Sequence, residues 1–169
     1  PTEGTAQICG CDILTQPVEA KKQFGYLPES APCYHAMTVS EYLAYAAELR
    51  GYQGSEKRDR IEATIVRCHL EGVRKQAIET LSKGYRQRTC MAQAILHDPP
   101  VLIMDEPTDG LDPNQKYVVR KMIQEMAASK AIIVSTHILE EVEAVCTRAI
   151  IIASGRIVAD GTTPELKSR

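Results

Sequence analysis

The segment VLIMDEPTDGLD, from Val101 to Asp112, indicates most about the fold. Its first four residues form a continuous apolar run, which is typical of a parallel strand buried on both faces. Asp105 and Glu106 follow at the carboxyl end of that strand. Asp105 suits Mg²⁺, held through its water shell, because this ion takes few protein carboxylates. Glu106 projects elsewhere and is placed to polarise an attacking water, although acids that simply end a strand at the solvent give the same pattern.

The sequence after this segment alternates helices and strands. Asp112 is a cap followed by proline at the first helical position, which predicts a helix from Pro113 to about Ala128. We then expect a strand, a helix, a strand and its hairpin partner at residues 131–136, 138–146, 149–154 and 155–161. This alternation predicts a parallel α/β sheet.

The sequence before the segment is mostly helical. Thr38 and Glu41 form a capping box ahead of a helix that ends near Gly51. A second amphipathic helix is expected over residues 55–72 and a short third one over 73–81. With no strand between them, these helices should form a lobe packed to one side of the sheet.

The amino-terminal residues predict small elements. Residues 5–13 mix short apolar side chains with glycine and indicate a strand, a turn and a second strand. Residues 18–30 indicate a short helix and then a strand that ends at Pro28. Glu29 therefore comes just after a strand end, where a polar turn residue is the ordinary explanation.

Two further positions suit a phosphate group. Ser82 caps a helix that starts at Lys83, and Gly84 lies in its first turn, so free backbone N–H groups and the helix dipole favour an anion there. An ordinary capped helix with a basic surface gives the same pattern. His137 follows an apolar strand and precedes a helix, where an imidazole can reach a phosphate or hold a water, although a lone histidine is often structural.

The composition is that of an ordinary globular domain, with 44% hydrophobic and 25% charged residues in 169. A net charge of −2, no tryptophan and one phenylalanine give no support for nucleic acid as a partner. No apolar run approaches the ~18 residues of a membrane span, so a membrane role should be peripheral. The six scattered cysteines fit neither a zinc site nor a disulfide framework, which favours reduced thiols.

The order and spacing of these motifs resemble the nucleotide-binding domain of ATP-binding cassette (ABC) transporters. LSKGYRQR (81–88) is similar to the signature motif, with Lys83 in place of the commoner glycine. VLIMDE resembles the Walker B strand, DGLD (109–112) the D-loop, and His137 the switch histidine. GYLPES (25–30) resembles the Q-loop, but Glu29 stands where glutamine is usual. Within the superfamily the chain looks most like the ATPase subunits of ABC-2-type exporters, which include gliding-motility and multidrug systems.

The resemblance implies an α/β fold of the P-loop NTPase type, with a mostly parallel sheet and an inserted α-helical subdomain. Residues 1–37 would form the remainder of the amino-terminal, β-rich part of the core with the Q-loop. Residues 38–81 would form the helical subdomain. Residues 82–169 would carry the signature helix and the α/β core with Walker B, D-loop and H-loop.

The phosphate-binding loop of this family is missing from the sequence. No Gly-x-x-x-x-Gly-Lys-Ser/Thr motif occurs in the 169 residues, and in the family it lies upstream of the stretch resembling residues 1–10. We therefore expect the first strand and the phosphate loop to be absent, with apolar neighbours exposed. The parent protein would be an ATPase, and the 169 residues an inactive fragment of it.

The resemblance also implies a mechanism in which two domains meet head to tail around two molecules of ATP. The ATP bound by the other domain would be contacted by Ser82, Lys83 and Gly84. Asp112 would communicate the state of one site to the other across the interface.

Within one domain, the resemblance assigns the chemistry to the strand ends. Asp105 would serve Mg²⁺, and Glu29 would contact the nucleotide and favour the metal. Glu106 would orient or deprotonate the water, and His137 would stabilise the γ-phosphate. The helical lobe would dock on a membrane-spanning permease subunit, which places the protein in the cytoplasm at the inner face of the membrane.

Two other functions stay open at this stage. A soluble ABC-type ATPase acting on DNA or ribosomes shares these motifs, but the modest helical lobe and the lack of basic runs argue against it. A non-catalytic partner module would lend Ser82 and Gly84 to another chain's ATP site. Intact Asp105, Glu106 and His137 argue against that, because an inactive site has no physical need for them.

Overall fold

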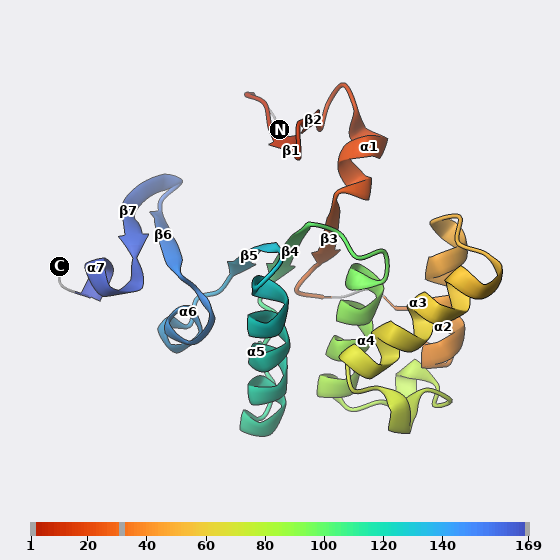
Figure 1. Ribbon diagram of the computed structural model, residues 1–169. Coiled ribbons are helices and arrows are strands. Elements are labelled where there is room, and N and C mark those ends of the chain that lie inside the picture. The colour runs from red at the N-terminus through yellow and green to blue at the C-terminus, as the bar shows by residue number, and fades with distance from the viewer. Residues whose placement is uncertain (1–2, 31–32, 168–169) are drawn as a thin grey trace.

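A three-stranded parallel sheet forms the centre of the protein (Figure 1). The computed structural model describes residues 3–30 and 33–167, so the parts of the predicted segments at residues 1–2, 31–32 and 168–169 lie outside it. The strands are β3 (Phe24–Leu27), β4 (Val101–Asp105) and β5 (Ala131–Ser135), in the order β3-β4-β5. In their register Leu27 lies beside Met104, and Asp105 beside Ser135. The parallel sheet confirms the predicted α/β class.

Two long helices cover one face of this sheet, as Figure 1 shows. Helix α4 (Lys83–Ile95) packs on β3, and helix α5 (Pro113–Ala127) packs on β5. The contact of α4 with β3 is close at Gly25, where a Cβ atom would lie 2.1 Å from the carbonyl oxygen of Ala94. Glycine is therefore required at this position, because any side chain would collide with the helix backbone.

A helical lobe lies beside α4 and consists of α2 (Val39–Leu49), α3 (Gly54–Arg67) and two 3₁₀ turns (Glu71–Val73 and Ile78–Thr80). The predicted capping box is present: the Glu41 amide donates to Oγ1 of Thr38 at 3.2 Å, and the Thr38 amide donates to Oε2 of Glu41 at 2.8 Å.

The short third helix predicted over residues 73–81 was wrong. The amides of Val39 and Ser40 instead donate to the carbonyls of Gln76 and Arg74, and Ala77 forms a β-bridge with Thr38. This pairing holds the backbone at Ala77 extended (ψ 137°), so only a 3₁₀ turn forms on either side.

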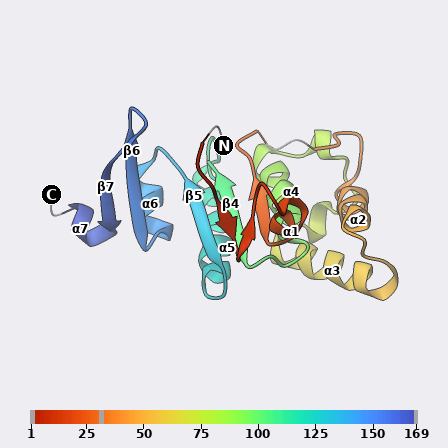
Figure 2. The same cartoon turned by 90° about the horizontal axis from the view of Figure 1, so that it is seen from above.

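The last strands form a separate antiparallel hairpin of β6 (Arg148–Ala153) and β7 (Arg156–Thr162). We expected the strand at 149–154 to continue the parallel alternation. In the described part of the chain its hydrogen bonds go to β7 alone, so it does not join β5. Seen from above, the hairpin and α7 (Thr163–Lys167) lie at the opposite end of the molecule from α2 and α3 (Figure 2).

The face of the sheet opposite α4 and α5 is only partly covered. In β4 Leu102 and Met104 are buried, whereas Val101 and Ile103 are half-buried, so the expectation of full burial on both faces was wrong. Beside them on β5, Ile133 is 61% exposed. The outer hairpin is also apolar and exposed, at Ile150, Ile151, Ile152, Ile157 and Val158.

The core lies between the sheet and the helices. Its largest fully buried side chains come from β3, α2, α3, α4, β4 and α5, among them Leu27, Leu43, Ile65, Met91, Leu102 and Met122. Burial of aliphatic side chains in one continuous cluster is the main stabilising contribution to such a fold. The helical lobe and the sheet therefore share one core.

Three small elements precede β3 in the chain. Strands β1 (Gln7–Ile8) and β2 (Cys11–Asp12) form a hairpin, and α1 (Pro17–Lys22) follows. The two-residue loop at Cys9 and Gly10 has positive φ at both positions, as a tight hairpin turn requires. No helix in the described ranges is both long and apolar enough to cross a membrane.

Candidate nucleotide-binding site

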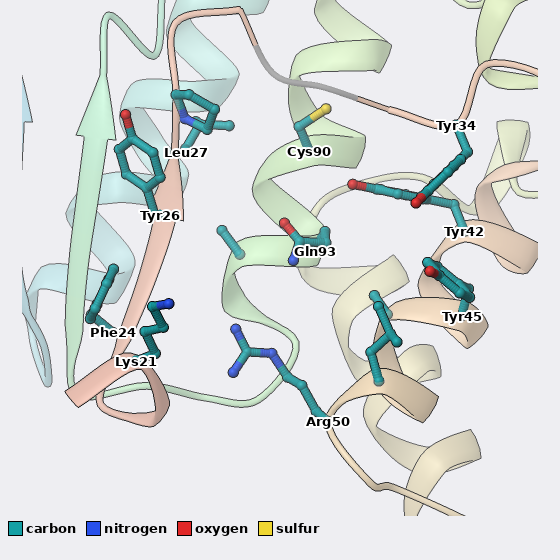
Figure 3. A pocket seen from close by; sticks show the side chains of 14 residues that line it. Lys21, Phe24, Tyr26, Leu27, Tyr34, Tyr42, Tyr45, Arg50, Cys90 and Gln93 are labelled. Atoms are coloured by element: carbon teal, nitrogen blue, oxygen red, sulfur yellow. The ribbon is translucent and has the colours of Figure 1, made fainter. Parts of the chain in front are cut away.

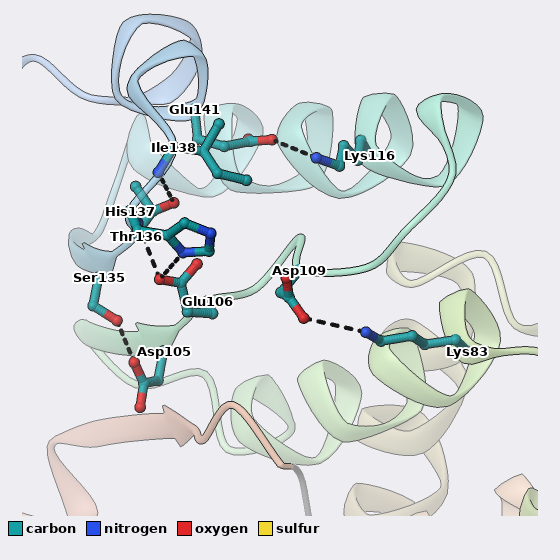
Figure 4. A network of polar contacts seen from close by, with 10 residues as sticks. All are labelled: Lys83, Asp105, Glu106, Asp109, Lys116, Ser135, Thr136, His137, Ile138 and Glu141. Atoms are coloured by element: carbon teal, nitrogen blue, oxygen red, sulfur yellow. Dashed lines mark hydrogen bonds and ion pairs between the residues drawn. The ribbon is translucent and has the colours of Figure 1, made fainter.

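The predicted site residues meet at the carboxyl edge of the parallel sheet (Figure 4). Asp105 ends β4 and Glu106 follows it, while His137 comes two residues after the end of β5. Glu29 comes two residues after the end of β3. Ligands of open α/β sheets bind outside the carboxyl ends of the strands, so this edge is where such residues are expected.

Glu106 and His137 are in direct contact. The Oε1 atom of Glu106 accepts a hydrogen bond from the His137 amide at 3.0 Å and lies 2.8 Å from Nδ1 of the imidazole. The Glu106 side chain is 17% exposed and that of His137 69%. Glu106 also has a φ of 45°, in the left-handed region that non-glycine residues rarely adopt. Backbone strain of this kind is concentrated at functional sites.

The local charges act on His137. Its pKa is raised, first by the hydrogen bond to Glu106 and then by the negative charges of Glu106, Asp109 and Glu29. A protonated imidazole at this edge carries positive charge, which favours a phosphate nearby.

Asp105 is the acid at the end of β4 for which sequence analysis predicted a role toward Mg²⁺. The Oγ atom of Ser135, on the neighbouring strand, donates a hydrogen bond to Oδ1 of Asp105 and orients the carboxylate. The residues present fit Mg²⁺, because that ion takes one or two carboxylates and completes its shell with water and phosphate. Within residues 3–30 and 33–167, no group of three or more His, Cys, Asp or Glu could form a metal site from protein alone.

Sequence reasoning missed Ser135, although a signal for it existed. Ser135 is paired with Asp105 in the sheet register, and the strand prediction for residues 131–136 placed it at the strand end. A hydroxyl beside a carboxylate on adjacent parallel strands is within hydrogen-bonding reach.

A second group of predicted residues lies at the start of α4. Ser82 caps this helix, with its Oγ accepting from the Tyr85 amide at 3.4 Å. The Nζ atom of Lys83 lies 3.3 Å from Oδ2 of Asp109. Both side chains of this ion pair are about half exposed, so its contribution to stability is small.

Gly84 is buried and faces the start of α5. A Cβ atom at Gly84 would lie 2.5 Å from Oε1 of Gln115, so α4 and α5 approach too closely here for a side chain without rearrangement. Asp112 caps α5 as predicted, accepting from the amides of Asn114 and Gln115 at 3.0 and 3.1 Å. Packing and capping thus give Gly84 and Asp112 structural roles in the free chain.

The two groups are connected through the turn after β4. The Asp109 amide donates to the Glu106 carbonyl at 3.1 Å, and the Asp109 carboxylate contacts Lys83. The structure therefore brings Asp105, Glu106 and His137 into one cluster, and Asp109 lies between this cluster and Lys83 (Figure 4). Ser82 and Gly84 flank Lys83 at the start of α4.

Comparisons with known proteins agree with this geometry. Residues 1–109 match the family model described as ABC transporter. The chain is 35% identical over 168 residues to the ABC transporter ATP-binding protein NatA of Bacillus subtilis (strain 168), covering 98% of this chain and 68% of that protein. It is 34% identical over 167 residues to the Nod factor export ATP-binding protein I of Ralstonia nicotianae, covering 98% of this chain and 52% of that one.

The solved structures point the same way. A structure of the ATP binding subunit of an ABC transporter superposes with a TM-score of 0.85 at 31% sequence identity, covering 99% of this chain and 70% of the other. The chain thus spans about half to two thirds of the two curated relatives named above. The parallel sheet, the acids and histidine at its carboxyl edge, and these matches lead to one conclusion: the chain belongs to the ATP-binding subunits of the ABC transporter family.

Proposed function

We propose that the full-length protein hydrolyses ATP and thereby drives export of a substrate through a separate membrane subunit. The observation that carries this proposal is the contact between Glu106 and His137 at the end of β4 and β5. A carboxylate that contacts a histidine and comes from a residue with a strained backbone, next to an aspartate suited to Mg²⁺, fits activation of a water for attack on a phosphate. Export is favoured by the similarity to the Nod factor export protein.

In this proposal the residues of the sheet edge divide the chemistry among them. Glu106 accepts a proton from the attacking water or orients it, and His137 donates a hydrogen bond to the γ-phosphate. Asp105 and Glu29 would hold Mg²⁺, with Asp105 acting through a water. The metal would neutralise charge on the phosphate oxygens when bound. Glu29 accepts hydrogen bonds but cannot donate one as a glutamine would, which makes it a metal-side rather than a phosphate-side group.

The start of α4 would serve a different ATP molecule. We place Ser82, Lys83 and Gly84 against the ATP held by a second ATPase domain in a head-to-tail dimer, with Asp112 at the interface. A helix amino terminus with a lysine beside it favours a polyphosphate. Lys83 would then exchange Asp109 for the γ-phosphate when the dimer closes.

A cavity between the helical lobe and the sheet is our candidate docking site for the permease subunit. It has a volume of about 630 Å³ and lies between α1, β3, α2 and α4 (Figure 3). Tyr34, Tyr42 and Tyr45 line it together with Lys21 and Arg50. An apolar cavity with aromatic walls and two cations fits a short protein segment that carries an acid. Docking here would hold the protein at the cytoplasmic face of the membrane.

The 169 residues by themselves lack the phosphate loop motif. The loop's amides and lysine supply much of the grip on the β- and γ-phosphates in P-loop proteins. We therefore propose that this stretch alone neither holds nor hydrolyses ATP with useful affinity. Activity has to be measured on the full-length chain as its gene encodes it.

The decisive experiment replaces Glu106 by Gln in the full-length protein. We expect ATP to bind and the dimer to form, while turnover falls by roughly 10² to 10⁴, the usual contribution of a general base. Glu140→Gln, an exposed acid on the helix after His137, is the matched control and should keep wild-type turnover. Wild-type turnover in Glu106→Gln would overturn the catalytic assignment. ATP binding without any turnover in the unmodified protein would instead favour a non-catalytic partner module.

A further inference from the structure

One buried carboxylate joins α5, which follows the turn after Glu106, to the helix after His137. Glu141 lies in the first turn of α6 (Leu139–Val145) and is only 2% exposed. Its Oε2 atom accepts a hydrogen bond from Nε of Arg120 at 2.8 Å, and its Oε1 atom accepts one from Nη2 of the same arginine at 2.7 Å. The pKa of the Glu141 carboxyl is lowered, first by Arg120 and to a smaller extent by the side chain of Thr108, which is also buried.

The partners of Glu141 belong to a polar row along α5. Lys116, Arg120 and Gln124 are spaced four residues apart and so lie on one side of the helix. Lys116 Nζ is 3.7 Å from Oε1 of Glu141 (Figure 4). The side-chain amide of Gln124 donates to the Ala144 carbonyl at 2.8 Å, near the other end of α6. This row therefore fixes α6 against α5 along its whole length.

This network lies beyond the point where strand pairing holds the segments that carry Glu106 and His137. Strand pairing holds the backbone only as far as the Glu106 amide, which donates to the Ser135 carbonyl at 3.1 Å. Beyond that point Glu106 continues into the turn that contains Thr108, and His137 leads into α6. Glu141, on α6, binds Arg120 on α5, the helix that begins where this turn ends.

Burying a charged side chain adds little net stability to a fold. Desolvation of a carboxylate and its cations offsets most of their attraction, and apolar side chains of similar volume often stabilise as well or better. A bidentate arginine–carboxylate pair does, however, fix the relative orientation of its two helices. The chemistry at Glu141 is therefore better suited to setting geometry than to adding stability.

We propose that Glu141 is a positioning residue that sets the separation of Glu106 and His137 by holding α6 to Arg120 and Lys116 of α5. The effect on catalysis rests on the proposed ATP hydrolysis, whereas the effect on geometry does not. Sequence analysis missed Glu141 because it is one of three acids in the stretch from Glu140 to Glu143. The available signal was the spacing of Lys116 and Arg120 on the preceding helix.

The test compares Glu141→Gln with Glu140→Gln in the full-length protein. We expect Glu141→Gln to lower kcat by about 10- to 100-fold, the range that a misplacement of ~1 Å produces, with KM for ATP little changed. The pKa of His137, followed by NMR and assigned with His137→Gln, should fall toward that of an ordinary histidine. The charges that raise this pKa belong to Glu106, Asp109 and Glu29, so such a fall reports movement of Glu106 away from the imidazole. Glu140→Gln should change neither quantity.

The proposal is overturned if Glu141→Gln lowers the melting temperature but leaves both kcat and the pKa of His137 as in Glu140→Gln. If Glu141→Gln does not fold, Arg120→Lys takes its place, because this variant keeps the positive charge and removes the bidentate geometry. The kcat and the pKa of His137 in Arg120→Lys then test the proposal in the same way. Wild-type turnover in Glu106→Gln would refute the proposed function. The NMR result would still show whether Glu141 positions His137.

Discussion

The imidazole Nδ1 of His137 lies 2.8 Å from Oε1 of Glu106, and the same oxygen accepts the His137 amide at 3.0 Å. One carboxylate oxygen thus holds both the ring and the backbone of the histidine. The other oxygen, Oε2, takes no part in this contact and can face a water. The arrangement holds the acid and the histidine together before any nucleotide binds.

This contact predicts a pH dependence. The pKa of His137 is raised in the folded protein, so its stabilising contribution is complete below the ordinary histidine pKa of about 6.5 and is lost as pH rises through the raised value. Glu106→Gln should bring the pKa of His137 back toward its ordinary value. We expect urea unfolding of the wild type to show this loss as pH rises above about 6.5, and the variant to show less of it. Equal pH profiles for the two proteins would contradict the prediction.

His97 predicts the opposite slope in a different pH window. Burial and the nearby Arg50 lower the pKa of His97 to about 4, and its Nε2 lies 3.2 Å from the Phe24 carbonyl oxygen. Because the unfolded chain takes up this proton near pH 6.5 and the folded chain does not, stability should fall as pH drops from about 6.5 toward 4.

The matched control for His97 is an exposed histidine. His97→Gln should flatten the decline between pH 6.5 and 4, because glutamine can still donate to the Phe24 carbonyl but does not titrate. His35→Gln, at an exposed position, should leave the decline unchanged. Chemical unfolding at several pH values measures both, and an unchanged slope in His97→Gln would refute the assignment.

Two glycines should respond differently to alanine. Gly25→Ala places a Cβ against the backbone of α4, whose carbonyl oxygen cannot move aside, and should cost about 3 kcal/mol or more. Gly84→Ala meets only the Gln115 side chain and should cost about 1 kcal/mol. In a Gln115→Ala background, Gly84→Ala should become neutral or stabilising by up to ~1 kcal/mol, because alanine favours the helix.

The readout is the free energy of unfolding from denaturant titrations of the four proteins in the Gly84 and Gln115 cycle. A cost for Gly84→Ala that persists without the Gln115 side chain would show that another contact demands the glycine.

Asp112 and Asp109 form a second matched pair, three residues apart. Asp112→Ala removes the cap of α5 and should destabilise by about 1 kcal/mol. Asp109→Ala removes only an ion pair that is about half exposed and should cost less than ~1 kcal/mol. Thermal unfolding in matched buffer ranks the two variants. The reverse ranking would mean that Asp109 anchors the turn more strongly than its contact with Lys83 indicates.

Much of the fold could be predicted from local patterns. The capping box at Thr38 and the Asp112-Pro113 start of α5 appear as expected, because caps depend on residues close in sequence. The failures occur where distant segments decide. The backbone at Ala77 pairs with the start of α2 and stays extended, and β6 pairs with β7 rather than with β5.

In the candidate site, too, residues recognisable from local patterns were predicted, and residues that depend on distant partners were missed. Asp105, Glu106 and His137 could be picked from strand ends, because the carboxyl edge of a parallel sheet gathers them. Ser135 and Glu141 were missed, because their roles depend on partners 30 and 21 residues away, Asp105 and Arg120.

The close approach of Gly25 to Ala94 also limits how the molecule can move. At Gly25 no side chain separates strand β3 from helix α4, so a displacement of one cannot be absorbed between them. We therefore expect the two elements to move together as a rigid body. Glu29 follows β3 and Ser82 precedes α4. In the proposed head-to-tail dimer, a displacement at the cavity beside α4 would therefore be felt at both nucleotides at once.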